Sequence, residues 1–240
     1  MKFYQKLYLR DVFEIKDIKI PIEITVNSSE IKNIDKGLDL DYLKNFTSNS
    51  EVGIIHAPFD GLSISTEDNT IREYSLKNIM GAIDLASILG AKKVIFHSGI
   101  REQGERKYKT LLNSMEELKK YSKKKKVKIL LENTYETIDI FKKLIQDTDL
   151  EFCFDIGHSN CFSKSQIDDW INTLYKRIGH LHLHDNNGNI DQHLSLGKGN
   201  IDFNKISGLI LEDIDITFET SLNDYEKNKD FILKLKSKKV

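Results

Sequence analysis

Short runs of apolar residues recur along the chain, and each ends in a residue type that binds metal. Six such runs end in His, Glu or Asp, and they cover residues 54–56, 94–97, 129–132, 152–155, 180–182 and 216–219. Short buried runs of this kind are typical of strands in a parallel sheet. We therefore predict a strand at each run, with a polar side chain at its carboxyl end.

The segments between these runs have mostly helical periodicity. In residues 69–89, Ile79, Ile83 and Ala86 recur at helical spacing, and Gly90 is a suitable helix stop. We expect strands over 21–26, 53–57, 93–97, 128–132, 151–155, 178–182 and 214–219, and one more near 8–15. Helices are expected over 29–46, 69–89, 106–124, 135–146, 163–175, 203–211 and 223–235.

The alternation of strands and helices predicts an α/β fold with a parallel sheet. A chain of 240 residues has the usual length of one (β/α)8 barrel, so we predict a single domain over residues 1–240. The first β/α unit is the exception, because too few residues separate its two expected strands to hold a crossover helix. Either this unit is reduced or atypical, or the first strand lies elsewhere.

The composition narrows the class of protein. The formal net charge is -1, so the basic surplus typical of nucleic-acid-binding proteins is absent. Cys153 lies within an expected strand, and its spacing from Cys161 is not that of a zinc finger, which suits a reducing cytoplasm. No apolar stretch reaches the roughly 18 residues of a membrane span, and residues 1–6 lack an apolar signal segment. We expect a cytoplasmic protein that does not enter a membrane.

Repeated strand–helix units in a barrel place every strand's carboxyl end on one face, where such enzymes carry their chemistry. Three of the expected strands end in carboxylates, namely Glu132, Asp155 and Glu219. Charged groups are almost never buried without a partner or a metal ion, and three adjacent carboxylates repel each other. We therefore predict that these three residues are catalytic and bind metal.

Further residues extend the predicted metal centre. His158 follows Asp155 by three positions, and Asp191 and His193 share one side of an extended loop. Five histidines and four carboxylates suit zinc, with manganese or iron as substitutes, and are enough for three ions rather than one. The nine predicted ligands are His56, His97, Glu132, Asp155, His158, His182, Asp191, His193 and Glu219.

Three alternating histidines, His180, His182 and His184, point to the same face of their expected strand. We predict that His182 lies at the level of the metal. His180 is expected deeper in the barrel, and His184 is expected to support the ligands without binding the ion.

Several motifs resemble the xylose isomerase-like TIM barrel superfamily (AP endonuclease family 2) and, within it, endonuclease IV. The resemblance covers about residues 21–220. The motifs that carry it are His56-Ala57-Pro58-Phe59, Phe96-His97-Ser98-Gly99, Leu131-Glu132-Asn133-Thr134, Asp155-Ile156-Gly157-His158, His182-Leu183-His184-Asp185, Asp191-Gln192-His193, Leu196-Gly197-Lys198-Gly199 and Phe218-Glu219-Thr220. Endonuclease IV uses three zinc ions to cut DNA beside abasic sites, and this is the activity that the resemblance implies.

The resemblance also implies a role for each predicted ligand. The first zinc would be held by His56, His97 and Glu132. The second would be held by Glu132, Asp155, His182 and Glu219, and the third by His158, Asp191 and His193. Phe59 would be the aromatic residue that enters the minor groove of DNA.

Three features of the chain depart from endonuclease IV. The N-terminal strand-and-helix unit of that enzyme, with its glycine-rich opening, is not recognisable. No arginine occurs in residues 26–29, where a DNA-penetrating arginine is expected, and the loop from His182 to Asp191 is short. The segment 184–188 is similar to a loop of the sugar isomerases and epimerases of the same superfamily. These enzymes need one metal ion, which would here be held by Glu132, Asp155, His182 and Glu219.

Three functions therefore remain open. The first is a zinc-dependent phosphoester hydrolase acting on abasic DNA, in which Arg101 and Lys198 bind phosphate and Zn²⁺ lowers the pKa of water. The second is a sugar or sugar-phosphate isomerase or epimerase, in which one divalent ion, such as Mn²⁺, assists while Glu132 and Glu219 move the proton. The third is a zinc-binding protein without catalytic activity. The sequence leaves the substrate, the native metal and the oligomeric state undetermined.

Overall fold

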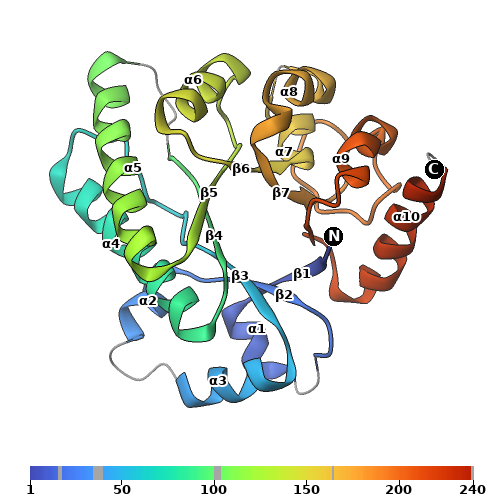
Figure 1. Cartoon of the computed structure of the whole chain (residues 1–240), viewed down its shortest axis with the longest axis horizontal. Helices are drawn as coiled ribbons and strands as arrows, with labels where there is room; N and C mark the ends of the chain where they lie inside the picture. Colours follow the sequence, from blue (N-terminus) through green and yellow to red (C-terminus); the bar gives the residue numbers. More distant parts are fainter. Residues whose placement is uncertain (16–17, 35–39, 100–103, 164, 239–240) are drawn as a thin grey trace. The chain divides into compact units, whose positions relative to one another are not determined.

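The computed structural model describes residues 1–15, 18–34, 40–99, 104–163 and 165–238. Eight strands follow one another in chain order, from β1 to β8, in a closed barrel. Figure 1 labels β1 to β7. The strand pairs whose registers are resolved are all parallel. The predicted (β/α)8 barrel is therefore confirmed.

The strands are short, as the length of the apolar runs predicts. They are β1 (Phe3–Tyr8), β2 (Ile22–Thr25), β3 (Val52–His56), β4 (Lys93–Phe96), β5 (Lys128–Glu132), β6 (Phe152–Asp155), β7 (Ile178–Leu183) and β8 (Ile216–Phe218). The α-helices are α1 (Leu9–Glu14), α2 (Ser28–Asn33), α3 (Leu40–Asn49), α4 (Asn69–Leu89), α5 (Glu105–Lys125), α6 (Ile138–Thr148), α7 (Ile156–Cys161), α8 (Ile167–Leu174), α9 (Ser207–Leu211) and α10 (Tyr225–Ser237). Three short 3₁₀ helices are η1 (Tyr175–Arg177), η2 (Phe203–Ile206) and η3 (Leu222–Asp224).

The chain forms two compact units, which we describe separately. Unit 2 comprises Leu7–Leu131 and Asp147–Leu150, and it holds β2, β3, β4 and most of β5. Its long helix α4 begins where the Asp68 side chain accepts hydrogen bonds from two backbone amides, and it ends at Gly90 in the left-handed conformation. The face predicted for this helix, which includes Ile79 and Ile83, is buried.

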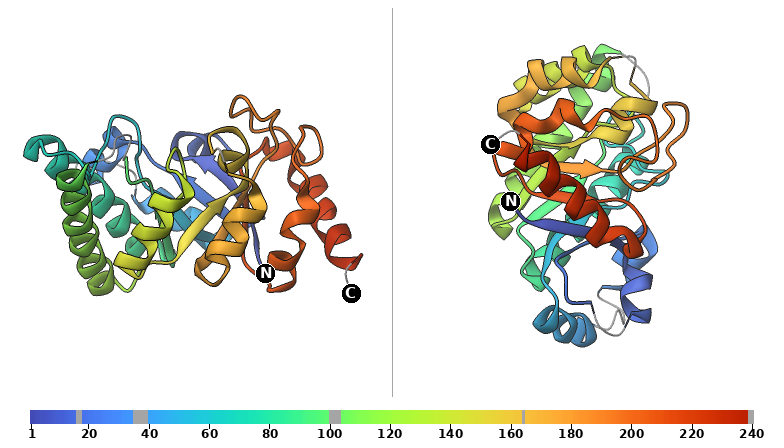
Figure 2. Two further views of the ribbon diagram at one scale, coloured as in Figure 1. Left: turned by 90° about the horizontal axis from the view of Figure 1, so that it is seen from above. Right: turned by 90° about the vertical axis from the view of Figure 1, so that its right-hand side faces the viewer.

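Unit 1 comprises Met1–Lys6, Glu132–Gln146 and Glu151–Val240. Strand β1 pairs with β8, β8 with β7, and β7 with β6. Behind β6, the indole ring of Trp170 contacts the rings of Phe141 and Phe154, with centroids 5.4 and 5.9 Å apart. The C-terminal helix α10 lies beside α9 (Figure 2). This apolar packing holds the strands whose carboxyl ends carry the predicted catalytic residues.

The strand expected near residues 8–15 is a wrong prediction. The first strand is Phe3–Tyr8, and residues 9–14 form the short helix α1, in which Leu9 and Val12 are buried one helical turn apart. The first β/α unit is therefore present, with a helix of six residues. The first strand thus lies elsewhere than expected, and the unit is also reduced, because its helix has only six residues.

Two helix predictions need correction. The single helix expected over 29–46 is replaced by α2, which ends at Asn33, and α3, which begins at Leu40; residues 35–39 between them lie outside the described part of the chain. The helix expected over 163–175 begins only at Ile167. It is preceded by α7, which was not predicted because its sequence combines glycine, histidine, serine and asparagine, all poor helix formers. Among the described helices, none is long and apolar enough to cross a membrane.

Candidate metal centre

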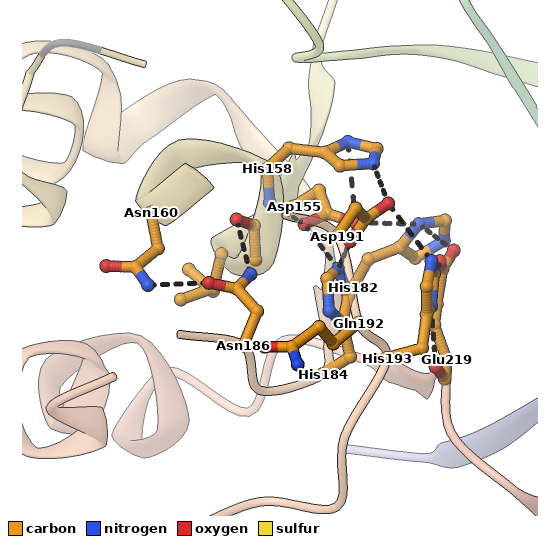
Figure 3. A network of polar contacts seen from close by, with 12 residues as sticks. Asp155, His158, Asn160, His182, His184, Asn186, Asp191, Gln192, His193 and Glu219 are labelled. Atoms are coloured by element: carbon orange, nitrogen blue, oxygen red, sulfur yellow. Dashed lines mark hydrogen bonds and ion pairs between the residues drawn. The ribbon is translucent and has the colours of Figure 1, made fainter. Parts of the chain in front are cut away.

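The carboxyl ends of β5 to β8 bring four predicted ligands together in unit 1. Glu132 and Asp155 are the last residues of β5 and β6, His182 lies near the end of β7, and Glu219 directly follows β8. Asp155 and His182 are register partners on adjacent strands. One ligand atom from each of the four residues can be chosen so that all four atoms lie within 4.8 Å of one another. All four residues are buried (Figure 3 shows three of them).

The imidazole of His182 is the centre of this first group. Its Nδ1 lies 2.9 Å from Glu132 Oε1, 2.7 Å from Glu219 Oε1 and 3.9 Å from Asp155 Oδ2. Asp155 Oδ2 is buried and has no hydrogen-bond partner among the described residues. Three buried carboxylates repel each other unless a cation offsets their charge, and a set of oxygen and imidazole donors suits Zn²⁺ or Mn²⁺. The residues therefore fit a divalent metal ion.

A second group forms around Asp191, on the loop after β7. Its Oδ2 lies 3.4 Å from His158 Nε2 and 3.1 Å from His193 Nε2. Its Oδ1 lies 3.3 Å from Nε2 of His184. Of the three residues predicted to bind one ion, Asp191 thus contacts both His158 and His193 (Figure 3).

Backbone carbonyls orient two of these imidazoles. His158 Nδ1 lies 3.0 Å from the carbonyl oxygen of Asn133, and His193 Nδ1 lies 2.7 Å from that of Glu219. A carbonyl only accepts, so each Nδ1 donates and each Nε2 faces Asp191. This arrangement is typical of histidines that bind metal through Nε2, because the second nitrogen then holds the ring in place.

Asp185 holds the loop that carries Asp191 and His193. Its buried carboxylate accepts hydrogen bonds from the backbone amides of Asn186, Gly197, Gly199 and Ile201, at 2.8 to 3.2 Å. A Cβ atom at Gly199 would lie 2.3 Å from Asp185 Oδ1, so only glycine fits there. The segment 197–201 therefore folds back onto Asp185 and closes the loop.

The electrostatics of the site favour ionised carboxylates. Burial raises the pKa of Glu219, but the Lys6 ammonium and His182 outweigh burial and hold this pKa well below its usual range. Lys6 Nζ lies 2.7 Å from Glu219 Oε1. Burial opposes ionisation of Asp191 as well, yet His158 and His193 lower its pKa.

The charges of the carboxylates raise the pKa of two neighbouring groups, His158 and Cys161. Burial lowers the pKa of His158, but Asp155, Asp191 and Glu132 outweigh it and raise this pKa to about 10. Burial, followed by the charges of Asp191 and Asp155, raises the pKa of Cys161 to about 12.

Sequence reasoning missed two residues of this centre. Lys6 lies near the carboxyl end of β1, but the first strand was expected elsewhere, which hid this position. His184 was expected to support the ligands, yet it lies among them, since its Nε2 is also 3.3 Å from Asp155 Oδ1. Its alternation with His182 was the available signal.

The other predicted site residues are placed as follows. In unit 2, His56 ends β3 and His97 follows β4, and their rings lie 5.1 Å apart, edge to face. Phe59 is half-buried, with its ring 4.9 Å from that of His97. Lys198, in unit 1, is exposed in a turn, and Arg101 lies outside the described residues.

Comparisons with known proteins agree with the fold. The model of the family described as "Xylose isomerase-like TIM barrel" matches residues 22–234. The uncharacterized protein MJ1614 of Methanocaldococcus jannaschii is 31% identical over 160 residues, which cover 62% of this chain and 62% of that protein. A probable endonuclease 4 of Mycobacterium ulcerans is 26% identical over 170 residues, covering 62% of this chain and 64% of that protein. The chain thus matches somewhat less than two thirds of these relatives' length.

Solved structures resemble the whole chain. The TTHB071 protein from Thermus thermophilus, soaked with ZnCl₂, has a TM-score of 0.82 at 22% identity, with 99% of each chain covered. A D-tagatose 3-epimerase-like protein has a TM-score of 0.80 at 24% identity, covering 100% of this chain and 99% of the other. At these identities the likeness shows the fold alone.

Proposed function

The chain belongs to the xylose isomerase-like TIM barrel family, and on that premise we propose that it is a phosphoester hydrolase that uses a cluster of divalent metal ions. One observation carries the proposal: Asp191 contacts both His158 and His193, at 3.4 and 3.1 Å, beside the group at the ends of β5 to β8. A catalytic zinc ion takes about three protein ligands, so the two groups are enough for two ions. An isomerase that uses one ion has no need of the second group.

The proposed ligands follow these groups. One ion would be held by Glu132, Asp155, His182 and Glu219, and another by His158, Asp191 and His193. His56 and His97, which lie close together in unit 2, remain proposed ligands of a third ion. The preferred metal is Zn²⁺, with Mn²⁺ as the alternative. Clustered divalent ions lower the pKa of water to near neutrality and offset the charge on attacking and leaving oxygens.

The protein's own groups would orient the reactants. Glu219 stays ionised between Lys6 and His182, so its carboxylate can accept a proton from the attacking water. Glu132, on the other side of His182, and Asp155 would hold the water in position. Lys198 and Arg101 are proposed to bind phosphate, and Phe59 to pack against the substrate.

We propose abasic DNA as the substrate. This rests on the resemblance of the ligand set to endonuclease IV and on the relative named probable endonuclease 4. The single-ion alternative is a sugar or sugar-phosphate isomerase or epimerase. It is favoured by the pairing of Glu132 and Glu219 on one imidazole nitrogen, because two glutamates can move a proton on opposite faces of a sugar.

Metal stoichiometry tests the proposal. Elemental analysis of unstripped protein is expected to find at least two zinc ions per chain. The same protein should cleave an oligonucleotide with one abasic site and leave an undamaged oligonucleotide intact. One ion per chain, together with turnover of a ketose and no cleavage, would establish the isomerase instead.

A further inference from the structure

His184 is a fully buried imidazole that lies between the two ligand groups. Its Nε2 lies 3.3 Å from Asp155 Oδ1 and 3.3 Å from Asp191 Oδ1. Neither of its ring nitrogens has a hydrogen-bond partner among the described residues. Buried polar side chains are nearly always hydrogen-bonded, so an imidazole directed at two carboxylates without a hydrogen bond needs an explanation.

The distances around His184 are those between ligands of one ion. Two atoms about 2.1 Å from a tetrahedral zinc ion lie about 3.4 Å apart. Nε2 of His184 lies 3.3 Å from Asp191 Oδ1, and the Nε2 atoms of His158 and His193 lie 3.4 and 3.1 Å from the other carboxylate oxygen, Oδ2.

The chain leaves space for this ring at one position. A Cβ atom at Gly157, in α7, would lie 1.9 Å from Cε1 and 2.1 Å from Nε2 of His184. No side chain larger than hydrogen fits there while His184 keeps its place. On its other side the ring stacks on that of His193, with centroids 4.2 Å apart and an angle of 19° between the planes. Gly157 and His193 therefore fix the position of the imidazole.

We propose that His184 is a metal ligand, and that it shares one ion with His158, His193 and Asp191. This rests on the proposed function, because it concerns the second ion of the proposed cluster. Ligand atoms of His184 also lie within 4.8 Å of those of two further sets, Asp155 with His158 and His193 with Glu219, so the ring adjoins both groups.

The additional imidazole has a consequence for metal choice. Three imidazoles and one carboxylate suit Zn²⁺ better than Mn²⁺, which prefers oxygen ligands. The group of three carboxylates and His182 has no such preference for Zn²⁺ over Mn²⁺, because most of its donors are oxygens. The second ion is therefore expected to be selective for zinc, whereas the first position exchanges more readily with manganese.

The test compares two variants of His184 with a control. After loading with zinc and dialysis, His184→Ala and His184→Gln are expected to hold one ion fewer per chain, or to bind the second ion at least about tenfold more weakly. The control is Thr217→Val, which alters an equally buried polar residue of β8 whose hydroxyl lies 2.8 Å from His180 Nε2. This control should keep the wild-type zinc content, and thermal unfolding should show that all three variants fold.

A second measurement uses the wild-type protein, so it does not depend on a folded variant. Protein with ¹⁵N-labelled histidine is loaded with ¹¹³Cd²⁺, and NMR coupling between the metal and the ring nitrogens is recorded. Coupling at Nε2 of His184 is expected. Zinc content unchanged in both His184 variants, or a His184 ring without coupling while His158 and His193 are coupled, would overturn the proposal and leave the proposed function standing. A wild-type protein that holds a single ion would instead contradict the proposed function.

Discussion

Lys6 Nζ lies 2.7 Å from Glu219 Oε1, so the first strand places a cation beside a carboxylate 213 residues further along the chain. Both side chains are largely buried, with exposed fractions of 14% and 1%. Lys6 is the largest of the influences that lower the pKa of Glu219 against the opposing effect of burial. It therefore keeps this carboxylate ionised in a site that already holds several negative charges.

Replacing Lys6 tests this role. In Lys6→Met the pKa of Glu219 is expected to rise, because burial is then less well opposed. Activity should also fall about tenfold at neutral pH, because Glu219 loses an outer contact that orients its carboxylate. The acidic limb of the pH–rate profile of Lys6→Met should lie at higher pH than that of the wild type.

The matched control for this variant is Lys227→Met, which removes an exposed lysine paired with Asp224 at 3.7 Å. It should leave the pH–rate profile unchanged. An unshifted acidic limb in Lys6→Met would show that Glu219 does not depend on Lys6.

His193 separates the two enzymatic functions. If the protein is a hydrolase, His193→Ala should lower its activity by at least about 100-fold, because the second ion loses a ligand beside Asp191. An isomerase that uses one ion at Glu132, Asp155, His182 and Glu219 should lose little activity. Steady-state rates on abasic DNA and on ketoses measure the difference, with Asn189→Ala on the same exposed loop as the control.

Asp185 is expected to contribute to stability. Asp185→Asn replaces a carboxylate that accepts four backbone amides by a group with one accepting oxygen. Losing hydrogen bonds to a buried charged acceptor should cost about 2 kcal/mol in the free energy of unfolding. Denaturant unfolding measures this loss. Asp230→Asn on the exposed face of α10 should unfold like the wild type, and an equally stable Asp185→Asn would contradict the role assigned to Asp185.

Metal binding is expected to strengthen as the pH rises. The pKa of His158 is raised from 6.5 to about 10, because Asp155, Asp191 and Glu132 outweigh the opposing effect of burial. A protonated His158 cannot bind an ion, so zinc must displace this proton. In the metal-free protein, the raised pKa stabilises the fold fully below pH 6.5, and this contribution is lost as the pH rises through about 10.

The difference in Tm between zinc-loaded and metal-free protein should therefore increase from about pH 6.5 to about pH 10. Thermal unfolding with and without a chelator, repeated across this range, measures it. In His158→Ala the increase should be smaller. A difference independent of pH in the wild type would show that His158 does not exchange its proton for the metal.

The architecture and most of the candidate site could be predicted from local pattern. The apolar runs that end at Glu132, Asp155 and His182 are strands, because buried parallel strands are short and continuously apolar. Once the strands are parallel and the barrel is closed, their last residues must share one end. No contact between distant residues was needed for that conclusion.

The prediction of the first strand was wrong, also for a local reason. Residues 9–14 place Leu9 and Val12 on one buried face, but a helix of six residues is too short for its period to be distinguished from that of a strand. Lys6 was hidden by this error. Its partner Glu219 could not be identified from either segment alone, because the pairing of β1 with β8 depends on closure of the barrel.

The position of His184 could not be predicted from the local sequence pattern. Alternation along β7 places it on the same face as His182, and one strand reaches the level of the metal only once. The strand ends at Leu183, however, and beyond it the chain turns so that the ring of His184 passes over Gly157 and stacks on His193. The apolar pattern was sufficient for the strands and the residues at their ends. The side chains around Asp191 are brought together by the hydrogen bonds of Asp185 to its loop and by the space beside Gly157. Both features form only when the chain packs, so the sequence pattern does not show them.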